Sequence, residues 1–274
     1  MRIPALAFAA LFALAGCFAP ASSPADDGAA AGALDLSQPY RFSLNATCIE
    51  SDIILLVDMA KLQGQLPDGF HAADASSLGG LPVSPPTGRG AVLATAFVCD
   101  TTDRNASYAE GQVAILVDAP DVAGDRPAAF LDFYELYRYV PMGQPGPKLD
   151  ALGWAHEHGN VSATMTRTSG TGEVVGHEGP AFSMTVTTPG SAQAQGTARF
   201  WHDLPTGLAW VDYTFETPVD QLLGRVECDI ASGSVLAEAS GITTCGPDNS
   251  LGMGFAAISP AVAFEYAPGV HASS

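Results

Sequence analysis

The chain has 274 residues, of which 29 are acidic and 11 are basic, so its net charge is −18 at pH 7. This balance argues against a nucleic-acid partner, because phosphate binding relies on clustered Lys and Arg side chains. It also argues against electrostatic attraction to an anionic bilayer, so attachment to a membrane requires another kind of anchor.

The N-terminus is typical of an exported lipoprotein. Residues 1–16 combine a basic start at Arg2 with an apolar stretch and end in Leu-Ala-Gly, directly before Cys17. Such a signal is too short to span a membrane as a stable helix. The pattern resembles the prokaryotic lipobox, in which the cysteine is lipidated, and the alternative is a secretory signal with a chance cysteine. We expect an extracytoplasmic protein, at the cell surface or in the periplasm, anchored through Cys17.

Composition also predicts the domain boundaries. Residues 17–37 are mostly small, polar or proline and predict a flexible tether. No later segment offers the roughly 18 continuous apolar residues of a membrane-spanning helix. We therefore expect one β-rich domain over residues 38–268, followed by a tail over residues 269–274.

Alternating apolar and polar side chains predict most of the strands. Half-buried strands are predicted at residues 161–166, 182–187, 208–215 and 262–266, and more fully buried strands at residues 91–99 and 111–117. The glycine-rich residues 170–176 are one residue longer than a dinucleotide fingerprint, so we predict a hairpin turn there and no cofactor.

Two helices are predicted between the strands. A short helix follows Asp58, and a second covers residues 130–139, where aromatic residues recur at helical spacing. These aromatic residues are Phe130, Phe133, Tyr134 and Tyr137. They form a core face or, for Phe130, Tyr134 and Tyr137, the lining of a ligand site. The order of elements predicts an α+β fold, a curled or closed antiparallel β-barrel with two helices packed on it.

The cysteines that follow Cys17 predict two disulfides. Cys48, Cys99, Cys228 and Cys245 are an even number in a chain assigned to an oxidising compartment. Four cysteines allow three pairings, and we favour Cys48 with Cys99 and Cys228 with Cys245, because each pair lies near the edges of neighbouring predicted strands. None of them has the C-x-x-C spacing typical of zinc sites.

Two further patterns allow a site but also a plain surface. His156 and His158 would point to the same side of a strand, as two metal ligands must, although a polar surface loop explains them as well. Asn45, Asn105 and Asn160 satisfy the N-x-Ser/Thr rule for glycosylation, which such a Thr- and Ala-rich chain also meets by chance.

One family resemblance follows from the layout. Residues 66–70 (Leu-Pro-Asp-Gly-Phe) after a strand, the later Glu135-Leu136-Tyr137 segment and the strand-rich second half resemble the acetoacetate decarboxylase-like β-barrel superfamily, over about residues 40–266. The resemblance implies a β-barrel and a lysine, in a Glu…Pro-Lys segment, that forms a Schiff base with a keto acid.

The expected lysine is missing from its place in that segment. Met142 follows Pro141, and the nearest substitute is Lys148, which has no adjacent lysine to lower its pKa. The catalytic candidates are therefore Lys148 and Glu135. We expect a barrel that binds a small apolar or carboxylate ligand without catalysis, and the alternative is a divergent decarboxylase-like enzyme that uses Lys148 for keto-acid chemistry.

Overall fold

The structure is a computed structural model in which ten stretches of backbone are described. They are residues 40–44, 46–78, 85–101, 107–118, 120, 130–142, 153–188, 191–204, 207–258 and 262–270. Side chains are described at residues 48–78, 85–99, 109–118, 120, 131–142, 153–188, 198–204, 208–211 and 222–253. The predicted signal, the tether, Cys17, Asn45, Asn105 and Lys148 lie outside the described residues, as does the side chain of Phe130.

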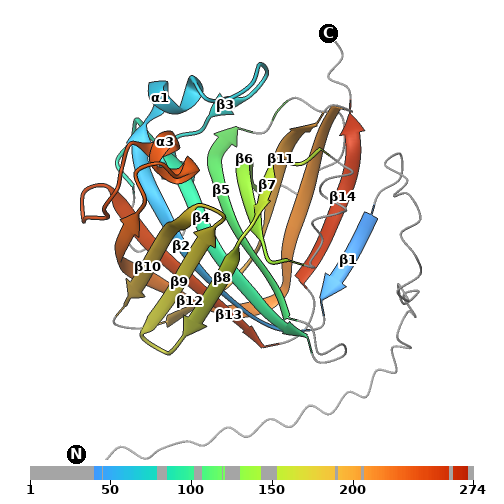
Figure 1. The fold of residues 1–274 in the computed structure, drawn as a ribbon, viewed down its shortest axis with the longest axis vertical. Helices are drawn as coiled ribbons and strands as arrows, with labels where there is room; N and C mark the ends of the chain where they lie inside the picture. Colours follow the sequence, from blue (N-terminus) through green and yellow to red (C-terminus); the bar gives the residue numbers. More distant parts are fainter. Residues whose placement is uncertain are drawn as a thin grey trace, which may run out of the picture. The chain divides into compact units, whose positions relative to one another are not determined.

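Most of the described chain consists of strands that belong to one curled sheet (Figure 1). The strands are β1 (Tyr40–Leu44), β2 (Ala46–Asp58), β3 (His71–Ala72), β4 (Arg89–Thr101), β5 (Ser107–Asp118), β6 (Phe130–Val140), β7 (His156–His158), β8 (Asn160–Met165), β9 (Ser169–Gly176), β10 (Gly179–Thr187), β11 (Ser191–Leu204), β12 (Gly207–Ile230), β13 (Ser250–Ile258) and β14 (Val262–Val270). The helical segments are α1 (Met59–Gln63), the 3₁₀ turn η1 (Ala75–Ser77) and α3 (Val235–Ser240).

The sheet follows the order β11-β6-β5-β4-β2-β13-β12-β10-β9-β8, and β11 also pairs with β12. The strands from β11 to β12 therefore form a closed ring of pairings, and β10, β9 and β8 branch from β12. This confirms the predicted curled β-barrel with two helices. One correction concerns strand direction, because β6 pairs in parallel with both β11 and β7.

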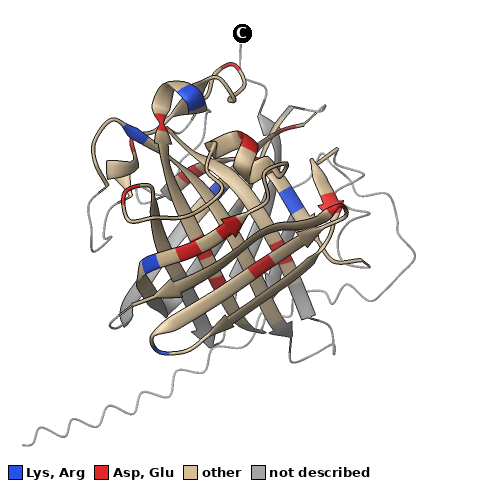
Figure 2. Ribbon diagram, turned by 60° about the vertical axis from the view of Figure 1, so that its left-hand side comes forward, with Lys and Arg blue, Asp and Glu red and all other residues tan. Residues whose placement is uncertain are grey.

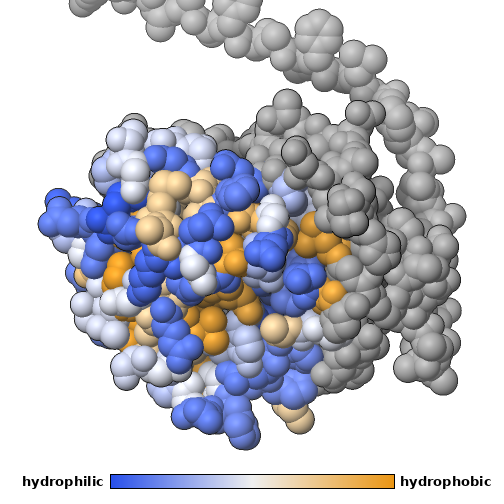
Figure 3. All heavy atoms as spheres, turned by 90° about the horizontal axis from the view of Figure 1, so that it is seen from above, coloured by the Kyte–Doolittle hydropathy of each residue, from blue (hydrophilic) through white to orange (hydrophobic). Residues whose placement is uncertain are grey.

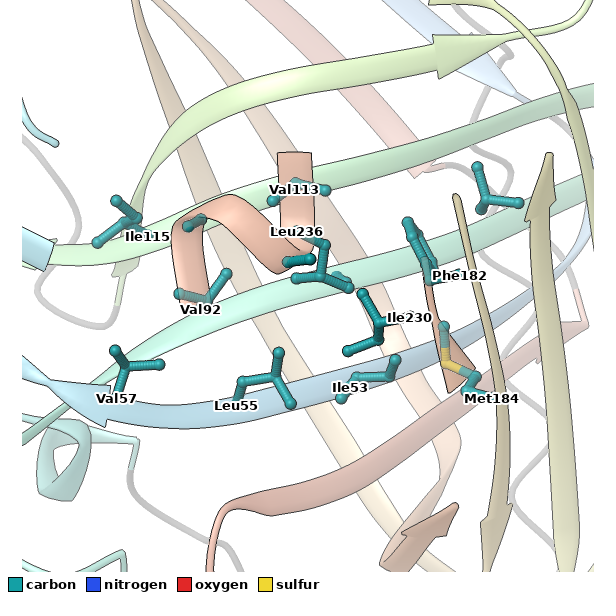
Figure 4. Packing of buried hydrophobic residues seen from close by; sticks show 14 of the residues in the cluster. Ile53, Leu55, Val57, Val92, Val113, Ile115, Phe182, Met184, Ile230 and Leu236 are labelled. Atoms are coloured by element: carbon teal, nitrogen blue, oxygen red, sulfur yellow. The ribbon is translucent and has the colours of Figure 1, made fainter. Parts of the chain in front are cut away.

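The four neighbouring strands β2, β4, β5 and β6 form a wall that is buried on both faces. The register places Ile53, Ala94 and Val113 side by side on one face, here called the apolar face. This face packs against side chains of β9, β10, β12 and α3, and Figure 4 shows part of that core. The opposite face carries Asp52 and Ile54, which are 1% and 2% exposed, so it too is shielded from water.

The strand predictions are confirmed, because each predicted range lies within a strand or one residue beyond its end. The glycine-rich residues 170–176 are a correction, since they lie in β9 and not in a turn. A Cβ atom on Gly172 would lie 2.8 Å from the Cβ of Ala96. Glycine here allows β9 to approach β4 closely, a packing requirement that a turn prediction does not consider.

One predicted helix is confirmed and the other is wrong. Asp58 caps α1, with its carboxylate accepting hydrogen bonds from the backbone N–H groups of Ala60 and Lys61. Residues 130–139, predicted as a helix, lie in strand β6, which pairs with β5 and β11. The short segment fits both the helical period of 3.6 residues and the strand period of two. Aromatic residues favour strands, and pairing with β5 and β11 stabilises the strand.

The second helix of the structure, α3, was not predicted. Ser234 caps its N-terminus, and Gly241, with a φ of 72°, ends it in the left-handed conformation. It lies beside α1 at one end of the sheet, where Gln65 Nε2 donates a hydrogen bond to the carbonyl of Ala239 (Figure 1). Seen from this end, hydrophilic residues surround smaller hydrophobic areas on the described surface (Figure 3).

Both predicted disulfides are confirmed. Cys48 on β2 and Cys99 on β4 are directly opposite each other in the sheet, and their sulfur atoms are bonded. Cys228 on β12 is bonded to Cys245, which follows α3. In the described part of the chain, no helix is long and apolar enough to cross a membrane.

Candidate functional site

The face of the wall opposite the apolar face is lined with polar side chains. The register places Asp52, Thr95, Gln112 and Arg138 in one row across β2, β4, β5 and β6. All four are at most 5% exposed. We define the polar face by its residues Glu50, Asp52, Thr95, Glu110, Gln112, Glu135 and Arg138. Burying so many polar groups costs stability unless they are paired.

A β-bulge in β6 brings Glu135 and Arg138 onto the same face. Residues three positions apart in a regular strand point to opposite faces. Here Ala114 is opposite Glu135 while its neighbour Val113 is opposite Tyr137, so Leu136 is an extra residue in β6. The bulge therefore creates the ion pair, which regular strand periodicity would not predict.

Arg138 joins two carboxylates on this face. Its Nε donates to Glu135 Oε1 at 2.8 Å and its Nη2 donates to Glu135 Oε2 at 2.7 Å, which is a bidentate pair. Its Nη1 lies 3.2 Å from Glu110 Oε2. Glu135 and Glu110 are 0% and 1% exposed, so one guanidinium contacts two buried carboxylates.

Trp154 closes over this ion pair. Its indole Nε1 donates to Glu135 Oε1 at 3.1 Å, and the guanidinium carbon of Arg138 lies 5.1 Å from the centre of the indole ring. The indole is also stacked on the imidazole of His202, with ring centres 4.6 Å apart and planes 5° apart. The rings of His202 on β11 and of Trp154, two residues before β7, thus shield the charged groups from water.

The hydrogen bonds of His202 define its tautomer. The backbone N–H of Ala155 donates to His202 Nε2 at 3.3 Å, so Nε2 is the acceptor and the proton resides on Nδ1. Nδ1 then donates to the Glu135 carbonyl at 3.2 Å. Burial lowers the pKa of His202 below its usual range. The ring is therefore neutral at pH 7 and adds no positive charge to the site.

Asp52 and Glu50 form the other part of the polar face. Among the described residues no N–H or hydroxyl group donates to either oxygen of Asp52, whose hydrogen-bond partner is the neighbouring Glu50 carboxyl, and the Thr95 hydroxyl has no partner. Burial, reinforced by the neighbouring Glu50 carboxyl, raises the pKa of Asp52 well above its usual range. Burial likewise raises the pKa of Glu50 to about 7. Two neighbouring carboxyls, Asp52 buried and Glu50 half-buried, can share a proton or accept a positively charged group.

The structure brings only one of the predicted site residues into this cluster, which is Glu135. Tyr134 and Tyr137 instead pack onto the apolar core, where the ring of Tyr134 lies 4.8 Å from that of Phe70. Met142, at the position where the resemblance places a lysine, is 79% exposed. Tyr134 and Tyr137 therefore take the core role that the sequence allowed, and a role in ligand binding stays a prediction.

His156 and His158, the predicted metal ligands, lie next to the polar face. The rings of His156 and His158 are 6.1 Å apart, and His156 Nδ1 lies 2.8 Å from the Trp154 carbonyl. In the described part of the chain, no group of three or more His, Cys, Asp or Glu residues is placed to hold a metal ion. Asn160 is exposed at the start of β8, and its glycosylation stays a prediction.

Sequence reasoning missed Asp52, Glu110 and Arg138. The clearest signal was Asp52, which directly precedes the apolar run of residues 53–57 in a strand that is buried on both faces. A charged side chain at such a position is rarely buried without a partner. Glu110 and Arg138 lack a comparable signal, because their pairing depends on the register of β5 and β6.

Figure 2 shows how acidic residues recur along the strands.

Solved structures with a similar fold identify this architecture. Neither a family model nor a curated protein sequence matches the chain. Acetoacetate decarboxylase from Legionella pneumophila superposes with a TM-score of 0.53 at 11% identity, covering 87% of this chain and 88% of that one. The chain has the acetoacetate decarboxylase-like fold. This confirms the fold that the sequence resemblance implied.

Two further structures agree. An acetoacetate decarboxylase-like enzyme from Sphingomonas wittichii RW1 gives a TM-score of 0.51 at 14% identity, covering 85% of this chain and 92% of that one. Another acetoacetate decarboxylase structure gives 0.50 at 13% identity, covering 82% and 88%. At these identities the likeness establishes the fold alone, and activity depends on the site.

Proposed function

We propose that the chain is an exported protein, anchored to a membrane by a lipid on Cys17, whose folded part binds a small molecule at the polar face without catalysis. The observation that carries the proposal is the carboxyl of Asp52, which is 1% exposed and has another acid, Glu50, as its hydrogen-bond partner, with no N–H or hydroxyl donor in the described part of the chain. Buried charged groups in folded proteins are nearly always paired, so two neighbouring acids without a donor indicate a missing partner.

The lysine chemistry of the decarboxylase fold has little support among the described residues. Met142 faces solvent where the resemblance expects the lysine, and the one lysine whose side chain is described, Lys61, is exposed on α1. A Schiff-base lysine needs a site that lowers its pKa by desolvation or by a neighbouring cation. The buried ionisable groups are instead mostly carboxyls, which favours binding.

Export is supported by the cysteines. Both disulfides link strands or a strand to a neighbouring segment of the folded unit, and disulfides persist in oxidising compartments. This agrees with the signal pattern before Cys17 and places the folded part outside the cytoplasm in the proposal.

Native mass spectrometry of the mature domain, purified from its own host, tests the binding function. We expect a mass above that of the polypeptide by one small molecule, lost when the same sample is denatured. The Asp52→Asn variant should carry less of the molecule than wild type, while Asp68→Asn, an exposed residue after α1, should carry the same amount. Identical native and denatured masses in wild type would contradict the proposal.

The second candidate is an enzyme of keto-acid chemistry, favoured by the shared fold and by the Pro147-Lys148 pair. Its test is reduction with borohydride in the presence of acetoacetate. An enzyme would gain the mass of a reduced Schiff base, and Lys148→Met would not. We expect no mass increase in either protein, because the polar face described here contains no lysine.

A further inference from the structure

We propose that the molecule bound at the polar face is a small organic cation, held through an amine or guanidine group by Asp52 and Glu50. This inference rests on the proposed binding function and specifies the chemical class of its ligand. It departs from the carboxylate ligand expected from the sequence.

The first argument is the balance of charge. Four carboxyl groups lie on the polar face, from Glu50, Asp52, Glu110 and Glu135, against the single guanidinium of Arg138. All three nitrogens of that guanidinium already face Glu135 or Glu110. His202, the neighbouring imidazole, is neutral. Glu50 and Asp52 are therefore left without a protein cation in the described part of the chain.

The second argument is the match of hydrogen-bonding groups. Asp52 and Glu50 are two residues apart in β2 and so point to the same side, and Thr95 is directly opposite Asp52 on β4. No N–H or hydroxyl donor among the described residues reaches either oxygen of Asp52, and the Thr95 hydroxyl has no partner there. The only group acting on Asp52 that we identify is the Glu50 carboxyl, with which it can share a proton. An ammonium group offers three donors and no acceptor, and it complements two carboxylates and a hydroxyl oxygen.

Other classes of ligand fit this arrangement less well. A carboxylate ligand would place a further negative charge beside buried acids, which costs free energy. A divalent metal ion requires several protein oxygen ligands, and the described residues contain no group of three that is placed to supply them. The net charge of −18 also raises the local concentration of cations around the whole molecule.

Isothermal titration calorimetry of the mature domain with 1,4-diaminobutane tests this inference. The titration is run at about 0.15 M salt, where exposed charges more than about 8 Å apart are largely screened. We expect saturable binding to wild type and to Asp68→Asn, and at least tenfold weaker binding to Asp52→Asn. Acetoacetate, the matched anionic probe, should not bind. If Asp52→Asn fails to fold, as judged by circular dichroism, Glu50→Gln replaces it with the same expected loss.

Two results would overturn the inference. One is equal affinity of wild type and Asp52→Asn for the diamine, which would mean that only the acidic surface attracts it. The other is binding of acetoacetate in place of the diamine. In the native mass spectrum, a co-purified neutral or anionic molecule would leave the binding function standing and defeat the cation, whereas the absence of any bound molecule would count against the binding function itself.

Discussion

At the scale of single residues, Arg138 is the group on which the polar face depends. Replacing it by methionine removes the counter-charge that Arg138 supplies to Glu135 and Glu110, and breaking a buried ion pair costs about 3–5 kcal/mol. We expect the urea midpoint of the Arg138→Met mature domain to fall accordingly at pH 7.5. Arg225→Met, at an exposed position on β12, should change stability by less than about 0.5 kcal/mol. Equal midpoints for the two variants would show that the pair has no structural role.

Asp52 and Glu50 should make stability depend on pH. Both have a pKa that is raised in the folded state, so folding is favoured where they are protonated. Their contribution is fully present below the usual carboxyl pKa of about 4 and is lost as the pH rises through the raised pKa of each group, which is about 7 for Glu50. Asp52→Asn removes part of this loss, because the amide does not ionise.

The measurement is urea unfolding of wild type and Asp52→Asn at pH 4.5 and pH 8. The titration of unrelated groups cancels in the difference between the two unfolding free energies at each pH. We expect the variant to be more stable than wild type at pH 8 by at least about 1 kcal/mol, corresponding to less than one pKa unit. The difference should shrink or reverse at pH 4.5. A difference that is the same at both pH values would rule out a buried ionising Asp52.

At the scale of elements, the close approach of β9 to β4 sets the thickness of the core. A methyl group added to Gly172 would meet the Cβ of Ala96 at 2.8 Å and that of Ser51 at 3.2 Å, so Gly172→Ala should separate the layers. Overpacking of this kind costs about 1–3 kcal/mol. Gly233→Ala, which would meet no atom within 4 Å, is the control and should be nearly neutral in the same thermal melt. Equal melting temperatures would mean that β9 shifts freely.

The disulfides should differ in their effect because they close loops of different length. Cys48–Cys99 spans 51 residues and Cys228–Cys245 spans 17. On the chain-entropy model, these stabilise by about 4 and about 3 kcal/mol respectively. Replacing each pair by alanines and measuring urea unfolding tests the order. Free thiols titrated on the denatured, unreduced mature domain should number zero, and four would show that neither bond forms.

At the scale of the whole molecule, the proposed lipid determines where the site operates. An acidic domain is repelled by anionic bilayers, so the proposed attachment rests on the lipid at Cys17. We expect radioactive fatty acid to label wild type in its host and not to label Cys17→Ala, which should also move from the membrane fraction to the soluble fraction. Alanine at this position leaves the folded part unchanged, so the domain of the variant should melt at the same temperature. Equal labelling would refute lipid anchoring.

Local patterns were sufficient for most strands and for α1, and they favoured the observed cysteine pairing over the two alternatives. Side-chain alternation in β8 and β10 reflects one buried face, which a single strand records in its own sequence. The helix predicted for residues 130–139 was wrong because the aromatic residues fit both the helical and the strand period. Hydrogen bonding to β5 and β11 stabilises the strand. Helix α3 carried its capping residues but too short an apolar pattern to be recognised.

Composition and local patterns established the class of fold, the acidic character and the signal pattern, and they favoured one of three possible cysteine pairings. The site follows from the assembled sheet. Glu110, Glu135 and Arg138 meet because of the register of β5 with β6 and the bulge at Leu136, neither of which leaves a local pattern. Asp52 is buried because both faces of the wall are covered by distant segments. Burial and long-range register are properties of the assembled sheet, and they decide whether a charged side chain is a solvated surface group or part of a site.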